Sequence, residues 1–202
     1  MPVKDNREYR SFQLRDMKLT KEEDGACIVE GYATTFDEPY DFCCGIKECI
    51  RHEALDEADM SDVIFQYNHE GMVLARQKNS TMELVCDEHG LHVKADISGV
   101  EQGRNLFEAI QNGLVDSMSW GFMVDKDGWE YDSENEISYI TKISKVYDVS
   151  AVSIPANADT EISARSYFQG VMEMKGKAEE VGRCDDGEQE RQRMALRLRL
   201  AR

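Results

Sequence analysis

The sequence contains no apolar run that approaches the roughly 18 residues a membrane-spanning helix needs. It also has no glycine-rich phosphate loop and no His-Glu-x-x-His motif, so it gives no support for nucleotide binding or for that kind of zinc peptidase. Basic side chains are scarce, because 24 Lys and Arg stand against 40 Asp and Glu, a formal net charge of −16. A phosphate-binding face needs the opposite charge. We therefore expect neither nucleic-acid nor membrane partners.

The first residues, MPVKDNREYRSFQ, lack the apolar segment of a secretion signal, which predicts a cytosolic location. The cysteine cluster Cys43, Cys44 and Cys49, with His52 three residues further on, leaves a zinc site as an alternative. A second ligand pair at the usual spacing is missing, so reduced structural thiols are the preferred interpretation.

The acidic stretch 125–136 offers four oxygen ligands of the type calcium prefers: Asp125, Asp127, Asp132 and Glu136. It does not follow the 12-residue helix–loop–helix pattern of a calcium-binding hand. We therefore expect a solvated acidic loop, and no metal or cofactor anywhere in the protein.

Hydrophobic patterning predicts a domain built mostly of strands. Strand patterns occupy residues 27–36, 81–86, 91–97, 113–122 and 137–156, and another begins at 63 and ends in a loop around Gly71. Helices are predicted over 51–62 and over 101–113, where Gly113 provides the C-terminal cap; residues 37–45 and 125–136 are predicted loops. Few βαβ units are present, so the expected class is α+β, with mostly antiparallel strands in a barrel-like arrangement.

The composition changes near residue 165. Residues 1–164 have the length and the apolar content of one compact domain. From 165 to 202, Gly, Glu, Gln and Arg dominate until the final RMALRLRLAR. This pattern predicts a charged, flexible tail that ends in a short basic helix.

Hydroxyl groups are the remaining candidates for chemistry. Ser117 and Ser119 alternate in the strand pattern GLVDSMSWGF, so both side chains share one face. Gly121 shares that face, and we expect its missing side chain to leave room for a substrate backbone. A serine needs a neighbouring base, and His69 stands directly after an apolar strand pattern. Serines satisfied by the backbone and a histidine with a local hydrogen bond are the structural alternatives.

Several segments occur in an order that resembles the prohead maturation proteases of tailed bacteriophages. The resemblance spans roughly residues 8–165. The segments that carry it are EGYATTFDEPY, ECIRHEALDEADMSDVIFQYNHE, MELVCDEHGLHVKADI, IQNGLVDSMSWGF and VYDVSAVSIPANADT. The most specific parts are Asn68-His69, the run that begins at Ser119, and the stretch that begins at Asp148.

The resemblance implies a serine endopeptidase with a fold similar to the herpesvirus assembly proteases, a small β-barrel surrounded by a few helices. Such enzymes are enclosed in an immature capsid, the prohead, in the host cytoplasm. There they cleave the scaffolding segment from the major capsid protein and commonly process themselves. A homodimer is expected by the same analogy. The alternative is a noncatalytic assembly protein that keeps the fold.

Position by position, the resemblance assigns the nucleophile to Ser119 and the general base to His69. The family's acidic residue, often Glu, falls on Asp148, which is one methylene shorter. His92 is the competitor for this third role, because the herpesvirus relatives use a second histidine. Strand alternation favours Asp148, which shares a face with apolar neighbours and is expected to be buried and paired.

Overall fold

The computed structural model describes residues 7–13, 18–23, 25–43 and 46–153. The strands of this part of the chain are β1 (Glu8–Gln13), β2 (Lys18–Lys21), β3 (Cys27–Thr35), β4 (Tyr40–Cys43), β5 (Ile46–Ile50), β6 (Ile64–Tyr67), β7 (Glu70–Arg76), β8 (Met82–Cys86), β9 (Gly90–Asp96), β10 (Ser117–Val124), β11 (Trp129–Asp132), β12 (Ile137–Ile140) and β13 (Ile143–Val152). Its helices are the 3₁₀ turns η1 (His52–Leu55) and η2 (Gln77–Asn79) and the α-helix α1 (Glu101–Gln111).

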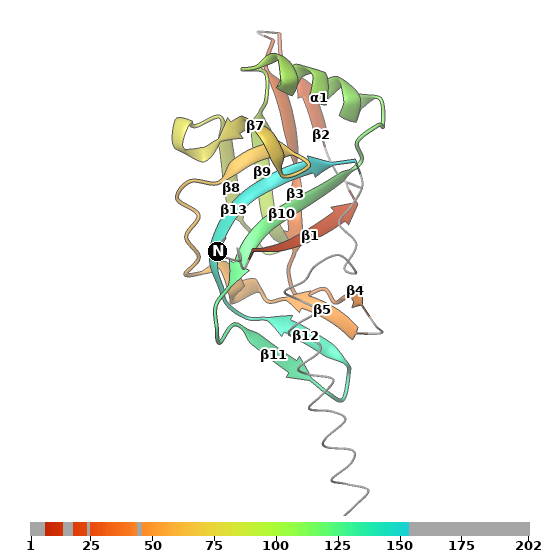
Figure 1. The fold of residues 1–202 in the computed structure, drawn as a ribbon, viewed down its shortest axis with the longest axis vertical. Coiled ribbons are helices and arrows are strands. Elements are labelled where there is room, and N and C mark those ends of the chain that lie inside the picture. Colours follow the sequence, from red (N-terminus) through yellow and green to blue (C-terminus); the bar gives the residue numbers. More distant parts are fainter. Residues whose placement is uncertain (1–6, 14–17, 24, 44–45, 154–202) are drawn as a thin grey trace, which may run out of the picture. The chain divides into compact units, whose positions relative to one another are not determined.

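The strands form three sheets (Figure 1). The largest has the order β1-β10-β13-β6-β7, and the two four-stranded sheets have the orders β2-β3-β9-β8 and β11-β12-β5-β4. Most neighbours are antiparallel, while β13–β6 and β12–β5 are parallel. Helix α1 lies at one end of the fold, next to β7 and β3 (Figure 1).

One hydrophobic core joins these elements. Residues from β3, β6, β9, β10 and β13 and from α1 contribute to a single cluster of buried apolar side chains. Trp120 and Phe122 of β10 stack in it with ring centroids 4.1 Å apart, and both are completely buried. Burial of apolar side chains of this size is the main source of stability for such a domain.

The strongest sequence patterns are confirmed. The predicted hairpin is β8–β9, where Leu91, Val93 and Ala95 are buried. The helix predicted over 101–113 is α1, and Gly113 follows its C-cap with a φ of 70°, the left-handed conformation that suits glycine.

Other predictions need correction. The predicted loops 37–45 and 125–136 contain strands β4 and β11, and the pattern 137–156 is divided between β12 and β13, which belong to different sheets. The segment after Gly71 is strand β7. The helix predicted over 51–62 is reduced to the single turn η1.

The fold class is confirmed only in its coarse form. The described residues are mostly strand and mostly antiparallel, with one α-helix. None of the three sheets they form closes into a barrel. The tail predicted over 165–202, and the domain boundary before it, lie outside the described residues.

A buried ion pair connects two of the sheets. Arg10 of β1 donates from Nε to Glu48 Oε1 at 2.5 Å and from Nη2 to Glu48 Oε2 at 2.9 Å, and both side chains are almost fully buried. The Tyr40 hydroxyl also donates to Glu48. Burial, reinforced by the charge of Glu48, raises the pKa of Tyr40 well above its ordinary value.

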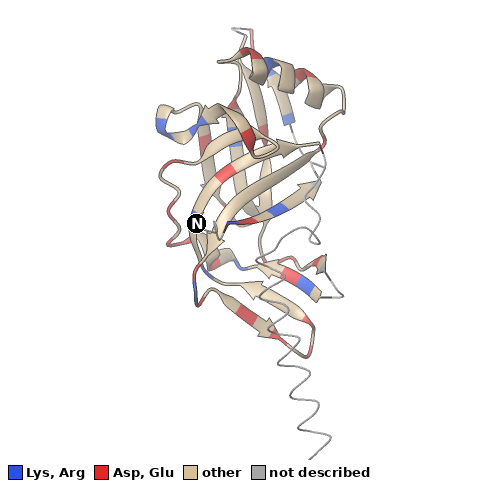
Figure 2. Ribbon diagram, viewed as in Figure 1, with Lys and Arg blue, Asp and Glu red and all other residues tan. Residues whose placement is uncertain are grey.

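Charged side chains cover much of the remaining surface. Acidic residues lie on elements of all three sheets and on α1 (Figure 2). Within the described ranges, no helix is long and apolar enough to cross a membrane.

Candidate active site

The first four residues of β10 alternate between an apolar face and a face that carries serines. Met118 and Trp120 are part of the hydrophobic core. Successive side chains of a strand point to opposite faces, so Ser117 and Ser119 point away from that core. Both serines are nonetheless buried, and no described residue gives the Ser119 hydroxyl a hydrogen-bond partner.

His69 stands on a two-residue hairpin turn between β6 and β7. Tyr67 pairs with Glu70, and the two residues between them, Asn68 and His69, have φ angles of 52° and 59°. Positive φ at both central positions is the signature of a type I′ turn, whose twist matches that of the flanking strands. Asparagine and histidine adopt this left-handed region more readily than most residues.

The histidine is hydrogen-bonded to a buried carboxylate. His69 Nδ1 lies within hydrogen-bonding distance of Asp148 Oδ2, and the Asp148 side chain is only 2% exposed. This contact leaves His69 Nε2 as the ring nitrogen available for another partner. That atom is buried and has no hydrogen-bond partner among the described residues.

Ser150 links the turn to the carboxylate. Its hydroxyl accepts the His69 backbone N–H at 3.2 Å and donates to Asp148 Oδ2 at 3.1 Å. Ser150 is also the partner of Ser119 in the β10–β13 ladder. Directly opposite residues have Cβ atoms about 5 Å apart. The ladder therefore places Ser119 beside the group that holds the histidine.

Strand β1 covers the other side of this group. The Tyr9 ring meets the His69 ring edge-on, with centroids 4.4 Å apart. Arg7 Nη1 lies 3.7 Å from Asp148 Oδ1. Gly121 is the ladder partner of both Tyr9 and Asp148, so these side chains meet above a residue that has none.

The expectation for Gly121 was therefore wrong. A Cβ atom at this position would lie 2.5 Å from Asp148 Oδ1 and 2.9 Å from Tyr9 Cε1. The missing side chain makes room for the carboxylate and the tyrosine, and not for a substrate backbone.

His92 is not part of this group. It lies on β9 in the β2-β3-β9-β8 sheet, where its Nε2 is 3.3 Å from Glu30 Oε1 and its ring contacts Tyr32. Of the two candidates for the third role, Asp148 is the one in contact with His69.

The metal alternatives gain no support from the described residues, which contain no group of three or more His, Cys, Asp or Glu placed to hold an ion. Cys49 is buried in β5, and burial raises the pKa of its thiol. His52 instead contacts the ring of Phe36. Cys44 lies outside the described residues.

Three neighbours of the site had no role in the sequence prediction. Ser150 follows Asp148 by two residues, and strand parity alone puts it on the same face. Arg7 and Tyr9 gave no comparable signal, because β1 was not predicted and its pairing with β10 spans more than a hundred residues.

A histidine held at Nδ1 by a buried carboxylate, with a serine on the neighbouring strand, is a combination that serine hydrolases use. Ser119 Oγ and His69 Nε2 are not hydrogen-bonded to each other in this structure, since neither atom has a hydrogen-bond partner among the described residues. The comparisons with known proteins agree with this class. The family model described as caudovirus prohead serine protease matches residues 15–174, and the chain belongs to this family. The protein is therefore a protease of phage prohead maturation, as the resemblance of its sequence to that family predicted.

Two relatives are informative. The prohead protease of Enterobacteria phage HK97 is 28% identical over 162 residues, which cover 80% of this chain and 69% of that protein. The structure of the bacteriophage T4 capsid assembly protease matches with a TM-score of 0.50 at 10% identity, and covers 74% of this chain and 98% of that one. The second likeness concerns the fold alone.

Proposed function

We propose that the protein is a serine endopeptidase with Ser119 as nucleophile, His69 as general base and Asp148 as the residue that orients the base. The observation that carries this assignment is the contact between His69 Nδ1 and Asp148 Oδ2. It fixes the ring and leaves Nε2 to serve the serine, which stands opposite Ser150 in the adjacent strand.

The chemistry follows from this arrangement. His69 Nε2 accepts the hydroxyl proton as Ser119 Oγ attacks the scissile carbonyl carbon, and Asp148 stabilises the imidazolium that forms. When the tetrahedral intermediate collapses, His69 gives that proton to the leaving amine and an acyl-enzyme remains. Water then attacks the ester carbonyl carbon while the same histidine takes its proton. When this second intermediate collapses, the bond to Ser119 Oγ breaks, His69 returns the proton to that oxygen, and the acyl part leaves as a carboxylic acid.

The buried state of the nucleophile adds a condition. The Ser119 side chain is completely buried, so cleavage requires that it first becomes accessible to a polypeptide. Labelling by a serine-directed fluorophosphonate requires Ser119 to be both accessible and activated by its base, so the labelling rate reports on both conditions.

The proposed substrate is the scaffolding segment of the major capsid protein, with self-cleavage as a second reaction. The names of the relatives, a prohead protease and a capsid assembly protease, support a capsid partner. The proposed location is the interior of the prohead in the host cytoplasm, and a homodimer stays a prediction.

Incubating the purified protein with its own capsid precursor tests the proposal. We expect cleavage that a phosphonate stops, with the label on Ser119. Ser119→Ala should abolish cleavage without loss of the fold, and Ser117→Ala, the matched control, should keep measurable activity. If Ser119→Ala still cleaves the precursor, the assignment is wrong. A folded wild-type protein that neither cleaves nor takes the label, even when assembled with its precursor into proheads, would be the noncatalytic assembly protein.

A further inference from the structure

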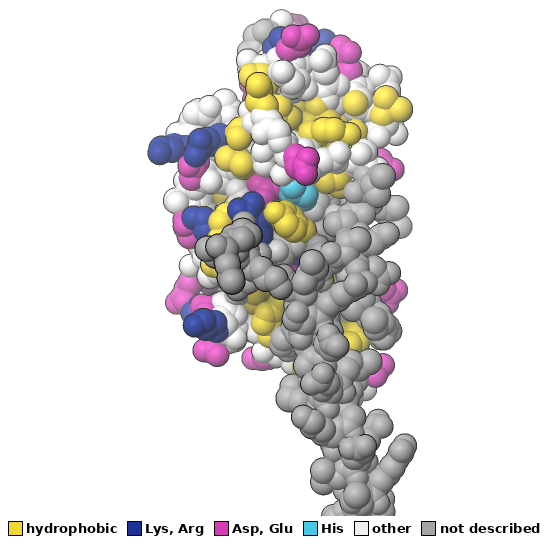
Figure 3. All heavy atoms as spheres, viewed as in Figure 1, with side chains coloured by type: hydrophobic (Ala, Val, Ile, Leu, Met, Phe, Trp, Pro, Cys, Tyr) yellow, Lys and Arg dark blue, Asp and Glu magenta, His cyan; other side chains and the backbone are white. Residues whose placement is uncertain are grey.

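An apolar groove of about 410 Å³ lies between helix α1 and the β6–β7 hairpin. Hydrophobic side chains gather on this surface below α1 (Figure 3). We call it the α1–hairpin groove, and its main lining residues are Tyr67, Glu70, Met72, Leu106, Ala109 and Val115. Its volume and its largely apolar lining with few polar groups are typical of sites that bind organic side chains or ligands.

The groove is bounded by the two segments that carry the proposed nucleophile and base. On one side, Tyr67 and Glu70 flank the turn that contains His69. On the other side, Val115 precedes Ser119 by four residues, a separation of at most about 14 Å along the chain. A polypeptide held at Ser119 therefore reaches the groove within a few residues of the bond that is cut.

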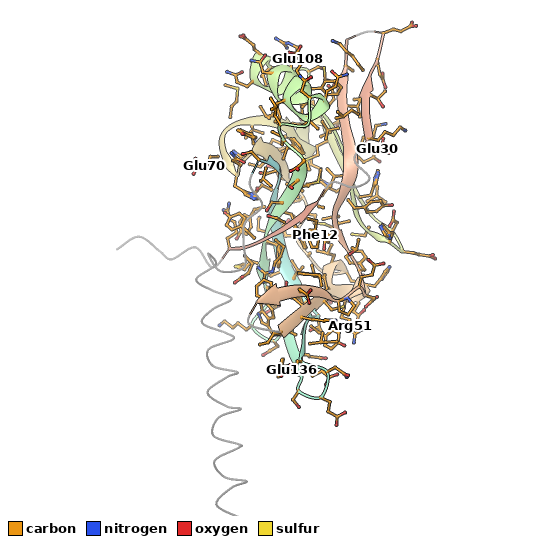
Figure 4. All side chains as sticks on the ribbon, turned by 90° about the vertical axis from the view of Figure 1, so that its right-hand side faces the viewer. Phe12, Glu30, Arg51, Glu70, Glu108 and Glu136 are labelled. Carbon is orange, nitrogen blue, oxygen red and sulfur yellow. The ribbon has the colours of Figure 1, made fainter. Side chains whose placement is uncertain are left out.

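The groove leaves apolar side chains in water. Tyr67 is 40% exposed and Met72 is 51% exposed, although both lie on a hairpin whose other residues reach the core. A charged group stands at the same place, because Glu70 is exposed and projects from the outer edge of the fold (Figure 4). Apolar walls with one carboxylate at the rim favour an apolar side chain that has a basic neighbour.

We propose that the α1–hairpin groove is a specificity site for the polypeptide that is cleaved. It receives an aliphatic or aromatic side chain a few residues from the scissile bond, and Glu70 favours a Lys or Arg next to that side chain. This inference rests on the proposed function. A second copy of this chain is a poorer occupant of this groove, because the Glu70 carboxylate at its rim favours a basic partner and the chain has 24 Lys and Arg against 40 Asp and Glu. The predicted homodimer is expected to use another surface.

The test uses a positional-scanning library of fluorescent undecapeptides, each with Leu, Phe or Ala at one position. Binding is measured by anisotropy to the Ser119→Ala protein, which leaves the peptides uncut, and cleavage is measured with the active enzyme. We expect one position at which Leu or Phe binds about tenfold more tightly than Ala, the size of effect an apolar pocket gives. Basic residues beside it should be preferred.

Two variants address the groove itself. Ala109→Phe fills it from the helix, and Met72→Asp places a charge on its wall at a side chain that is 51% exposed; a thermal melt checks that both variants fold. Each should remove the preference for Leu or Phe by raising KM, with kcat and phosphonate labelling unchanged. Glu70→Lys should reverse the preference to acidic neighbours. Val85→Asp is the matched control, because Val85 is 45% exposed on β8 in another sheet, and it should change nothing.

The outcomes separate the two proposals. If Met72→Asp binds and discriminates the peptides as the parent does, the groove is not a specificity site, whatever the catalytic residues are. The groove is also not a specificity site if Met72→Asp alters the oligomeric state and leaves the affinity for peptides unchanged. If peptides bind with the expected preference but the wild-type protein does not cut them, the groove assignment stands and the proposed endopeptidase activity of the purified protein fails.

Discussion

Replacing Gly121 by alanine tests the site through a single methyl group. The added Cβ would lie 2.5 Å from Asp148 Oδ1, 2.9 Å from Tyr9 Cε1 and 3.3 Å from Arg7 Cδ. Real Cβ atoms do not approach other atoms as closely as the first two distances, so the neighbours must move. The carboxylate is held by His69 and Ser150, and it cannot shift without loosening both contacts.

Two magnitudes follow. An extra methyl group in a packed site typically costs about 1–3 kcal/mol of folding free energy. For a domain of this size that lowers the melting temperature by roughly 2–12 °C. Misplacing a catalytic group by about 1 Å can cost on the order of 100-fold in rate. We therefore expect Gly121→Ala to fold, to melt roughly 2–12 °C lower and to lose about 100-fold in kcat/KM.

The assay is peptide cleavage at saturating and subsaturating substrate, together with a thermal melt. Gly99→Ala is the matched control, because a Cβ there meets nothing within 4 Å, and it should leave both measurements unchanged. The imidazole N–H resonance of His69 reports on the hydrogen bond independently of turnover. Wild-type kcat/KM in a folded Gly121→Ala protein would show that the Asp148 carboxylate need not stay where the structure places it.

Three further outcomes are expected. Asp148→Asn should keep the fold and lower kcat by about 10²–10⁴-fold, as loss of the orienting carboxylate does in other triads; a loss below tenfold in the cleavage assay would contradict that role. Arg10→Met should cost about 3–5 kcal/mol in a denaturation experiment, because it leaves the Glu48 carboxylate buried without the Arg10 charge, and adding Glu48→Leu should restore part of the loss. A chelator such as EDTA should leave peptide cleavage unchanged, and a metal-dependent loss would revive the zinc alternative.

The sequence predicted those parts of the fold that local patterns determine. The β8–β9 hairpin and helix α1 have clear periodicity and their own end signals, so their existence was predictable. The β10 serines were placed on one face by parity alone. Local patterns made Ser117, Ser119 and His69 candidates, and the family resemblance chose Ser119 and added Asp148. No local rule would have joined residues so far apart in the chain.

The missed elements depend on long-range partners. Strand β1 contains Glu8 and Arg10, charges that predict an exposed segment, yet both are buried because Glu48 of another sheet pairs with Arg10. Strand β11 was missed for a similar reason. It lies inside an acidic stretch and is defined by its pairing with β12. The chain between β12 and β13 changes sheets without a glycine or proline to mark the change.

The turn that carries His69 shows why the base sits where it does. Positive φ is unfavourable for residues other than glycine, although less so for Asn and His, and contacts with its surroundings help to hold this turn. Strand β13 supplies that support: Asn68 donates its backbone N–H to Ala151 O at 3.0 Å, and the His69 N–H donates to Ser150. The strand that positions the turn also carries Asp148. Base and carboxylate are therefore set by one element, and a shift of β13 moves both together relative to Ser119 on β10.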